Sequence, residues 1–114
     1  MLRIYSVILQ VVREVAPLAV VVGRADPDLA RQLRRALASV PLNTAEGSYS
    51  RGANRSARYQ NAAGSMREVL ACLEVAQAMG YVLGIEPALH ARVHHVFGTL
   101  VRVVRPGGQR HPPS

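Results

Sequence analysis

Apolar residues recur at alternating spacings of three and four along most of this chain, and this spacing constrains the fold more than any other feature. Such a spacing places side chains on one face of an α-helix, whereas a half-buried strand alternates apolar and polar residues. Four segments carry the helical pattern, at about residues 2–22, 27–40, 54–79 and 87–105. No segment shows strand-like alternation bounded by turns. The sequence therefore predicts an all-α protein.

The apolar stripes of these four segments are mostly aliphatic. In chain order their residues are Ile4, Ile8, Val11, Val15, Leu18 and Val22; Leu29, Leu33, Leu37 and Val40; Tyr59, Ala62, Met66, Val69, Leu73 and Ala76; Leu89, Val93, Val96, Leu100 and Val103. Four amphipathic helices with short connections imply an antiparallel up-down four-helix bundle. We expect one domain over residues 1–105 and a disordered tail, rich in Pro and Gly, at residues 106–114.

Proline, glycine and acidic residues mark the expected ends of the first two helices. Gly23 should end the first helix, and Pro17 should kink it because proline lacks the N–H that bonds to the preceding turn. The second helix should begin at Asp26-Pro27-Asp28, where a capping carboxylate precedes a proline suited to the first helical turn. Pro41 interrupts that helix, so we expect residues 41–47 to continue it in distorted form.

The later helices have similar signals. A polar connector at residues 48–54 should precede the third helix, which is expected to begin near residue 54 or 56 and to stop at Gly80. The small residues 63–65 should permit a close helix crossing. Glu86-Pro87 should open the fourth helix.

The first helix carries a second apolar stripe beside its core stripe. Its residues are Leu2, Tyr5, Leu9, Val12, Ala16 and Ala19. Two stripes exceed what one bundle needs, and only 18% of the residues are charged, which is low for a soluble domain. We therefore expect the first helix to contact its own bundle on one side and another copy of the chain on the other, in a homo-oligomer.

The same helix is not expected to cross a membrane. Polar residues interrupt its apolar character at Arg3, Ser6, Gln10, Arg13 and Glu14, and these positions also argue against a signal peptide. The single cysteine, Cys72, cannot form an intramolecular disulfide, and it lies mid-helix as a small core residue. Cytoplasmic localisation is the expectation.

The chain is strongly basic, and all its basic residues are arginine. It has 14 Arg, no Lys and 7 acidic residues, for a net charge of +7, so enzyme classes that need a lysine are excluded. Between Arg31 and Arg67 there are seven arginines and one acid, Glu46, which places six of the seven net charges in that window. Guanidinium groups bind phosphates well. We predict RNA or DNA binding through Arg31, Arg34, Arg35, Arg51, Arg55 and Arg58.

One alternative interpretation of these arginines stays open. The arginines could form an ordinary solvated face whose stems cover apolar surface, and Tyr49 and Tyr59 give only weak support for base stacking.

A catalytic site is not expected, because no second carboxylate, His or Cys lies at a matched spacing from Glu46. His90 and His94 follow Glu86 at intervals of four, a spacing that can hold a divalent metal, but surface positions are the simpler interpretation and neither a metal nor a cofactor is predicted.

Two blocks of sequence carry a family resemblance. The first is an Arg-rich helix that ends in Ser39-x-x-x-Asn43-x-Ala45-Glu46-Gly47, and the second is Gly64-Ser65-x-x-Glu68. In these blocks the chain resembles the four-helix bundle family associated with intervening sequences of bacterial 23S ribosomal RNA. The resemblance implies a small bundle that forms a ring-shaped homopentamer, with structural roles for Asn43, Glu46, Gly47, Gly64, Ser65 and Glu68.

That family is in turn similar to the accessory protein of diversity-generating retroelements, a basic pentamer that binds nucleic acid and works with a reverse transcriptase. Together with the charge pattern, the resemblance predicts a non-catalytic oligomer that binds RNA or DNA through an Arg-rich face. The alternative is a protein scaffold or adaptor, such as an accessory protein for a retroelement reverse transcriptase.

Overall fold

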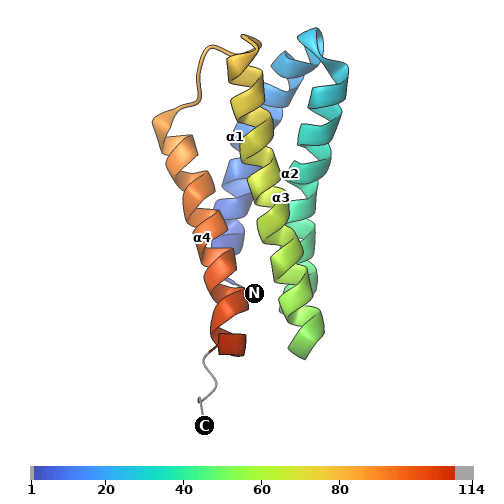
Figure 1. The fold of residues 1–114 in the computed structure, drawn as a ribbon, viewed down its shortest axis with the longest axis vertical. Helices are drawn as coiled ribbons and strands as arrows, with labels where there is room; N and C mark the ends of the chain where they lie inside the picture. Colours follow the sequence, from blue (N-terminus) through green and yellow to red (C-terminus); the bar gives the residue numbers. More distant parts are fainter. Residues whose placement is uncertain (1, 110–114) are drawn as a thin grey trace.

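The computed structural model describes the backbone of residues 2–109 and the side chains of residues 2–104. Its four helices are α1 (Ile4–Ala25), α2 (Pro27–Ser48), α3 (Gly52–Ala78) and α4 (Pro87–Gln109). Successive helices run in opposite directions and pack side by side, and α4 returns to α1 to close the bundle (Figure 1). The predicted all-α, up-down four-helix architecture is confirmed.

The first helix does not end at Gly23, as the sequence suggested, but continues to Ala25. Only Asp26 leaves the helical conformation before α2 begins. Its backbone N–H donates to the Val22 carbonyl over 2.8 Å, and its carboxylate accepts from the Leu29 N–H over 3.0 Å. One glycine in a helix interior costs about 1 kcal/mol, and the buried packing of Val22 outweighs that cost. The predicted cap at Asp26 is confirmed.

The second helix passes through Pro41 without a break and ends at Ser48. Pro41 removes the N–H that would bond to the Leu37 carbonyl. Side chains in the same region bond back to the helix: Thr44 Oγ1 donates to the Val40 carbonyl over 2.7 Å, and Asn43 Nδ2 donates to the Ser39 carbonyl over 3.0 Å. The buried face continues past the proline with Thr44 and Gly47, so packing keeps the segment helical.

The connector before α3 is shorter than predicted, because α3 begins at Gly52 rather than at residue 54 or 56. Gly52 has a φ of +57° and Gly80 has a φ of +81°, and glycine reaches this left-handed region without strain. α4 begins at Pro87, as predicted. Its bounds extend four residues into the predicted tail, to Gln109, and residues 110–114 lie outside the described part of the chain.

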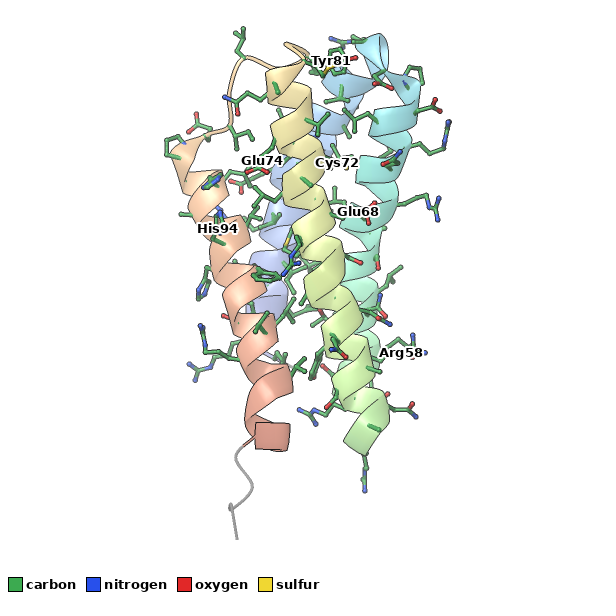
Figure 2. The ribbon with its side chains drawn as sticks, viewed as in Figure 1. Arg58, Glu68, Cys72, Glu74, Tyr81 and His94 are labelled. Carbon is green, nitrogen blue, oxygen red and sulfur yellow. The ribbon has the colours of Figure 1, made fainter. Side chains whose placement is uncertain are left out.

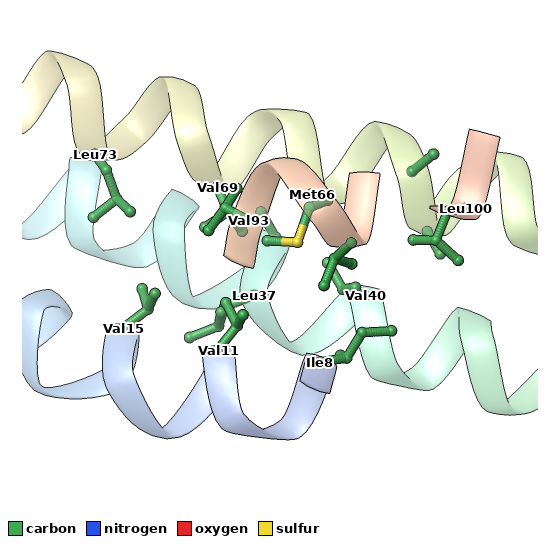
Figure 3. Packing of buried hydrophobic residues seen from close by; sticks show 14 of the residues in the cluster. Ile8, Val11, Val15, Leu37, Val40, Met66, Val69, Leu73, Val93 and Leu100 are labelled. Atoms are coloured by element: carbon green, nitrogen blue, oxygen red, sulfur yellow. The ribbon is translucent and has the colours of Figure 1, made fainter. Parts of the chain in front are cut away.

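The core follows the predicted stripes closely (Figure 3). All six stripe residues of α3 are buried, including Tyr59, whose ring packs against α2. In α1 the stripe shifts from the predicted Leu18, which is half-buried, to Ala19, because an α-helix with 3.6 residues per turn drifts away from a strict repeat of three and four. Cys72 is buried in the core, and burial, together with the carboxylate of Glu68, raises the pKa of its thiol.

The outer face of α1 stays apolar at the surface of the single chain. Val20 and Val21 are 49% and 38% exposed, and Leu9 and Val12 are half-buried. By length and composition, α1 is the one helix within residues 2–109 that could cross a membrane, although it also contributes six residues to the bundle core.

Candidate nucleic-acid interface

All six arginines predicted to bind nucleic acid are exposed. Arg31, Arg34 and Arg35 lie in the first part of α2, and Arg51, Arg55 and Arg58 lie at and after the start of α3. Because α2 and α3 are antiparallel, these two groups occupy different heights along the bundle (Figure 1). The window of sequence that holds the charge is therefore an elongated array in space rather than one compact patch.

A groove along the outer seam of α2 and α3 connects the two groups. It consists of two adjoining hollows of about 460 and 440 Å³, which share Arg35 and Ser39. We call this feature the α2–α3 groove. Its lining residues are Gln32, Arg35, Ala36, Ala38, Ser39, Leu42, Asn43, Glu46, Arg58, Ser65 and Glu68. Arg35 and Arg58 thus face one groove although 23 positions separate them in the sequence.

A chain of hydrogen bonds crosses the groove from α3 to α2. Ser65 Oγ donates to Ser39 Oγ over 2.7 Å, and Asn43 Nδ2 donates to the same Ser39 oxygen over 2.9 Å. Arg58 Nη1 lies 3.5 Å from Asn43 Oδ1, which completes the chain. The two sequence blocks that carry the family resemblance therefore meet at Ser39, and Asn43 acts within a continuous helix rather than at a helix break.

The remaining motif residues have different surroundings. Gly47 is buried beneath the ring of Tyr59, whereas Gly64 is exposed with no atom within 4 Å of the position a Cβ would take. Glu46 and Glu68 are exposed and line opposite ends of the α2–α3 groove. Among side chains of residues 2–104, neither carboxylate forms an ion pair.

Most of the candidate arginines are free to bind an anion. Arg31 pairs with Asp28 on the protein surface, and within the described side chains none of the other five arginines forms an ion pair with a carboxylate. The Arg55 guanidinium lies 5.4 Å from the centre of the Tyr59 ring. That ring is 1% exposed, so it is not accessible for base stacking, while Tyr49 is 85% exposed.

The start of α3 concentrates positive charge. Every residue from Arg51 to Arg58 is exposed, and the first turn contains no acidic residue and no side-chain cap. The helix dipole adds partial positive charge at this end. Arg55 and Arg58 therefore project from the exposed first turns of α3, and Arg51 lies at its N-cap.

The histidines of α4 lie away from this interface. The rings of His90 and His94 are 4.5 Å apart and both residues are exposed. A search of the described residues found no group of three side chains able to hold a metal ion.

Sequence reasoning missed Gln32 and Leu42 as lining residues of the α2–α3 groove. Their helical spacing from Arg35, at three positions before and seven after, could have found them. In Figure 2, Arg58 projects from α3 on the side that faces away from α4. His94 lies on α4.

The chain was compared with known proteins. A family model described as 23S rRNA-intervening sequence protein matches residues 2–88, which include α1, α2, α3 and the first residues of α4. Comparisons with curated proteins and with solved structures gave no match.

Proposed function

The chain belongs to the 23S rRNA-intervening sequence protein family, and from this premise we propose that it binds RNA or DNA through the arginines of α2 and α3. The observation that carries the proposal is the array of exposed arginines beside the α2–α3 groove, five of which have no carboxylate partner within residues 2–104. The family has no known catalytic activity, and the proposed role is binding alone.

Arg35 and Arg58 are the central contacts in this proposal. Each guanidinium can donate two parallel hydrogen bonds to a phosphate, and the groove holds both groups along one seam. The axial distance from Arg31 to Asn43, opposite Arg58, is about 18 Å at 1.5 Å per residue. A nucleic-acid backbone that follows the seam can therefore contact arginines of α2 and α3 together. These contacts are to phosphate, so binding is not specific for sequence.

A second copy of the chain is part of the proposal. The exposed valines of α1 and the half-buried apolar residues beside them favour a homo-oligomer, and the family resemblance implies a homopentameric ring as its specific form. An assembly repeats the arginine array on each subunit and so multiplies the number of phosphate contacts. Light scattering on the purified protein measures the assembly, and a monomeric mass at micromolar concentration refutes this part.

The nucleic-acid proposal is tested by fluorescence anisotropy with a labelled RNA strand and a labelled DNA duplex across a salt series. The double variant Arg35→Gln/Arg58→Gln should weaken binding and reduce the slope of log K against log salt by roughly 1.5 to 2. Arg13→Gln/Arg102→Gln removes the same charge from exposed positions on α1 and α4 and is the matched control. Equal binding by the two double variants refutes the site.

The alternative function is a scaffold or adaptor for an acidic protein, such as an accessory role for a reverse transcriptase. It is favoured by wild-type protein that binds neither probe at low salt, provided that the protein carries no co-purified nucleic acid. The array and the groove would then serve a protein surface rich in carboxylates.

A further inference from the structure

A small pocket opens between α3 and α4, on the other side of α3 from the α2–α3 groove. Its volume is about 170 Å³, which is below the range of about 300–1,000 Å³ usual for drug-sized ligands. Its lining residues are Met66, Arg67, Leu70, Val93, His94 and Phe97. We call it the α3–α4 pocket. A cavity of this size fits one or two side chains.

The walls of the pocket are apolar and its rim is basic. Met66 and Val93 are buried, and Leu70 and Phe97 are half-buried. Arg67 and His94 are exposed at the rim, and the Arg67 guanidinium lies 5.2 Å from the centre of the Phe97 ring. No acidic residue lines the pocket, and within the described side chains Arg67 has no ion pair. The pocket therefore combines apolar surface with an unpaired cation.

We propose that the α3–α4 pocket binds an apolar side chain of a partner protein that presents a carboxylate beside it. The apolar side chain would cover Leu70 and Phe97, and the carboxylate would accept hydrogen bonds from Arg67 at the rim. Burial of apolar area supplies most of the binding free energy, and the charge selects an acidic segment over a neutral or basic one.

A nucleobase fits this pocket less well than an acidic side-chain pair. The Watson–Crick edge of every base presents donors and acceptors together, so a pocket that binds such an edge needs acceptors as well as donors, whereas the O6/N7 edge of guanine presents acceptors alone. Arg67 can only donate, and the one further polar side chain in the lining is His94, whose neutral ring has one acceptor nitrogen. Carboxylates need donors alone, which the rim provides.

This inference is independent of nucleic-acid binding, because the α3–α4 pocket shares no lining residue with the α2–α3 groove. Loss of binding at one site therefore leaves binding at the other unchanged. A negative result for the α3–α4 pocket therefore does not refute nucleic-acid binding at the α2–α3 groove, and the reverse also holds.

The test is an NMR titration of the full chain with the acetylated and amidated peptide Asp-Leu-Phe-Asp and with its neutral counterpart Asn-Leu-Phe-Asn. Phe97 is the only phenylalanine of the chain, so its ring signals report the pocket without ambiguity. The acidic peptide should shift the Phe97 ring and Met66 methyl signals and bind about fivefold more tightly than the neutral peptide, the upper range for an exposed ion pair.

Two variants complete the experiment. Arg67→Gln should abolish the difference between the peptides, whereas Arg102→Gln, an exposed arginine of α4 outside the pocket lining, should keep it. Equal binding of the two peptides by wild-type protein overturns the proposal. So does a larger shift of the Phe97 ring with guanosine, which has no phosphate, than with the acidic peptide, because it would indicate a nucleobase pocket.

Discussion

The ring of Tyr59 occupies the space into which a side chain at position 47 would extend. A Cβ atom built on Gly47 lies 2.5 Å from Tyr59 Cε1 and 2.7 Å from Cδ1, closer than real carbon atoms approach. The Tyr59 hydroxyl lies 3.4 Å from Ser48 Oγ, so the ring is held at both its edge and its tip. Glycine at position 47 is thus what lets α2 and α3 close over a large aromatic residue.

Gly47→Ala should therefore destabilise the bundle. Contacts this short place the overpacking cost in the upper part of the usual range of about 1–3 kcal/mol. The higher helix propensity of alanine returns only about 1 kcal/mol, so the expected net loss is roughly 1–2 kcal/mol. Gly64→Ala is the matched control, since a Cβ at position 64 meets no atom within 4 Å and should raise stability by roughly 0.5–1 kcal/mol. Urea unfolding measures both changes, and an unchanged midpoint for Gly47→Ala contradicts the packing argument.

The hydroxyl of Ser39 should couple Asn43 to Ser65. Ser39→Ala removes the acceptor used by both side chains and should lower the free energy of unfolding by about 1 kcal/mol, because the site is only part-buried and water can replace one bond. In a double-mutant cycle, Ser65→Ala should cost much less when Ser39 is already alanine. Additive effects of the two substitutions would show that the hydroxyls do not interact.

The ion pair between Glu14 and Arg92 joins α1 to α4, the pair of helices that closes the bundle. Arg92 Nε donates to Glu14 Oε1 over 2.9 Å, and Arg92 Nη2 contacts the second carboxylate oxygen. Since both side chains are about a third exposed, a double-mutant cycle with Glu14→Gln and Arg92→Gln should give a coupling energy of roughly 0.5–1 kcal/mol. The exposed pair of Asp28 and Arg31 is the comparison, and its coupling should be smaller.

The thiol of Cys72 should react slowly with a disulfide reagent in the native protein. Burial raises its pKa first, and the negative charge of Glu68 raises it further, so the reactive thiolate is scarce at neutral pH. Glu68→Gln should lower the pKa and speed the reaction in the alkaline range. Because folding favours the protonated thiol, its contribution to stability is complete below the ordinary thiol pKa and is lost as the pH rises through the raised value. The predicted slow reaction is contradicted if the Cys72 thiol reacts with the reagent as fast in the native protein as in the unfolded protein.

The sequence predicts the helices well because the buried positions of a helix recur at intervals of three and four, and apolar residues occupy those positions in the sequence. All six residues of the predicted α3 stripe, from Tyr59 to Ala76, are buried, and Ala63 and Cys72 are buried beside them. Gly23 was misleading because tertiary packing outweighs a local preference against helix. The continuation of the second helix expected past Pro41 is present, and it reaches Ser48.

The candidate sites were harder to predict. The contact between Ser39 and Ser65 depends on how far α3 slides along α2, which no local pattern specifies. The same packing decides that Arg35 and Arg58 share a groove. The α3–α4 pocket leaves no motif at all, because Arg67 and Phe97 meet only through the crossing of two helices.

The single non-helical residue between α1 and α2 determines in which direction the arginines of α2 point. One residue inserted beside Asp26 would turn α2 by about 100° about its own axis, and the face of Leu33 and Leu37 could no longer point inward while α1 kept its place. The segment between α3 and α4 is longer, and after the buried Val82 it becomes exposed at Leu83. Length changes in evolution or in engineering are therefore expected between α3 and α4, while the junction at Asp26 keeps its length and so decides which side of the bundle is basic.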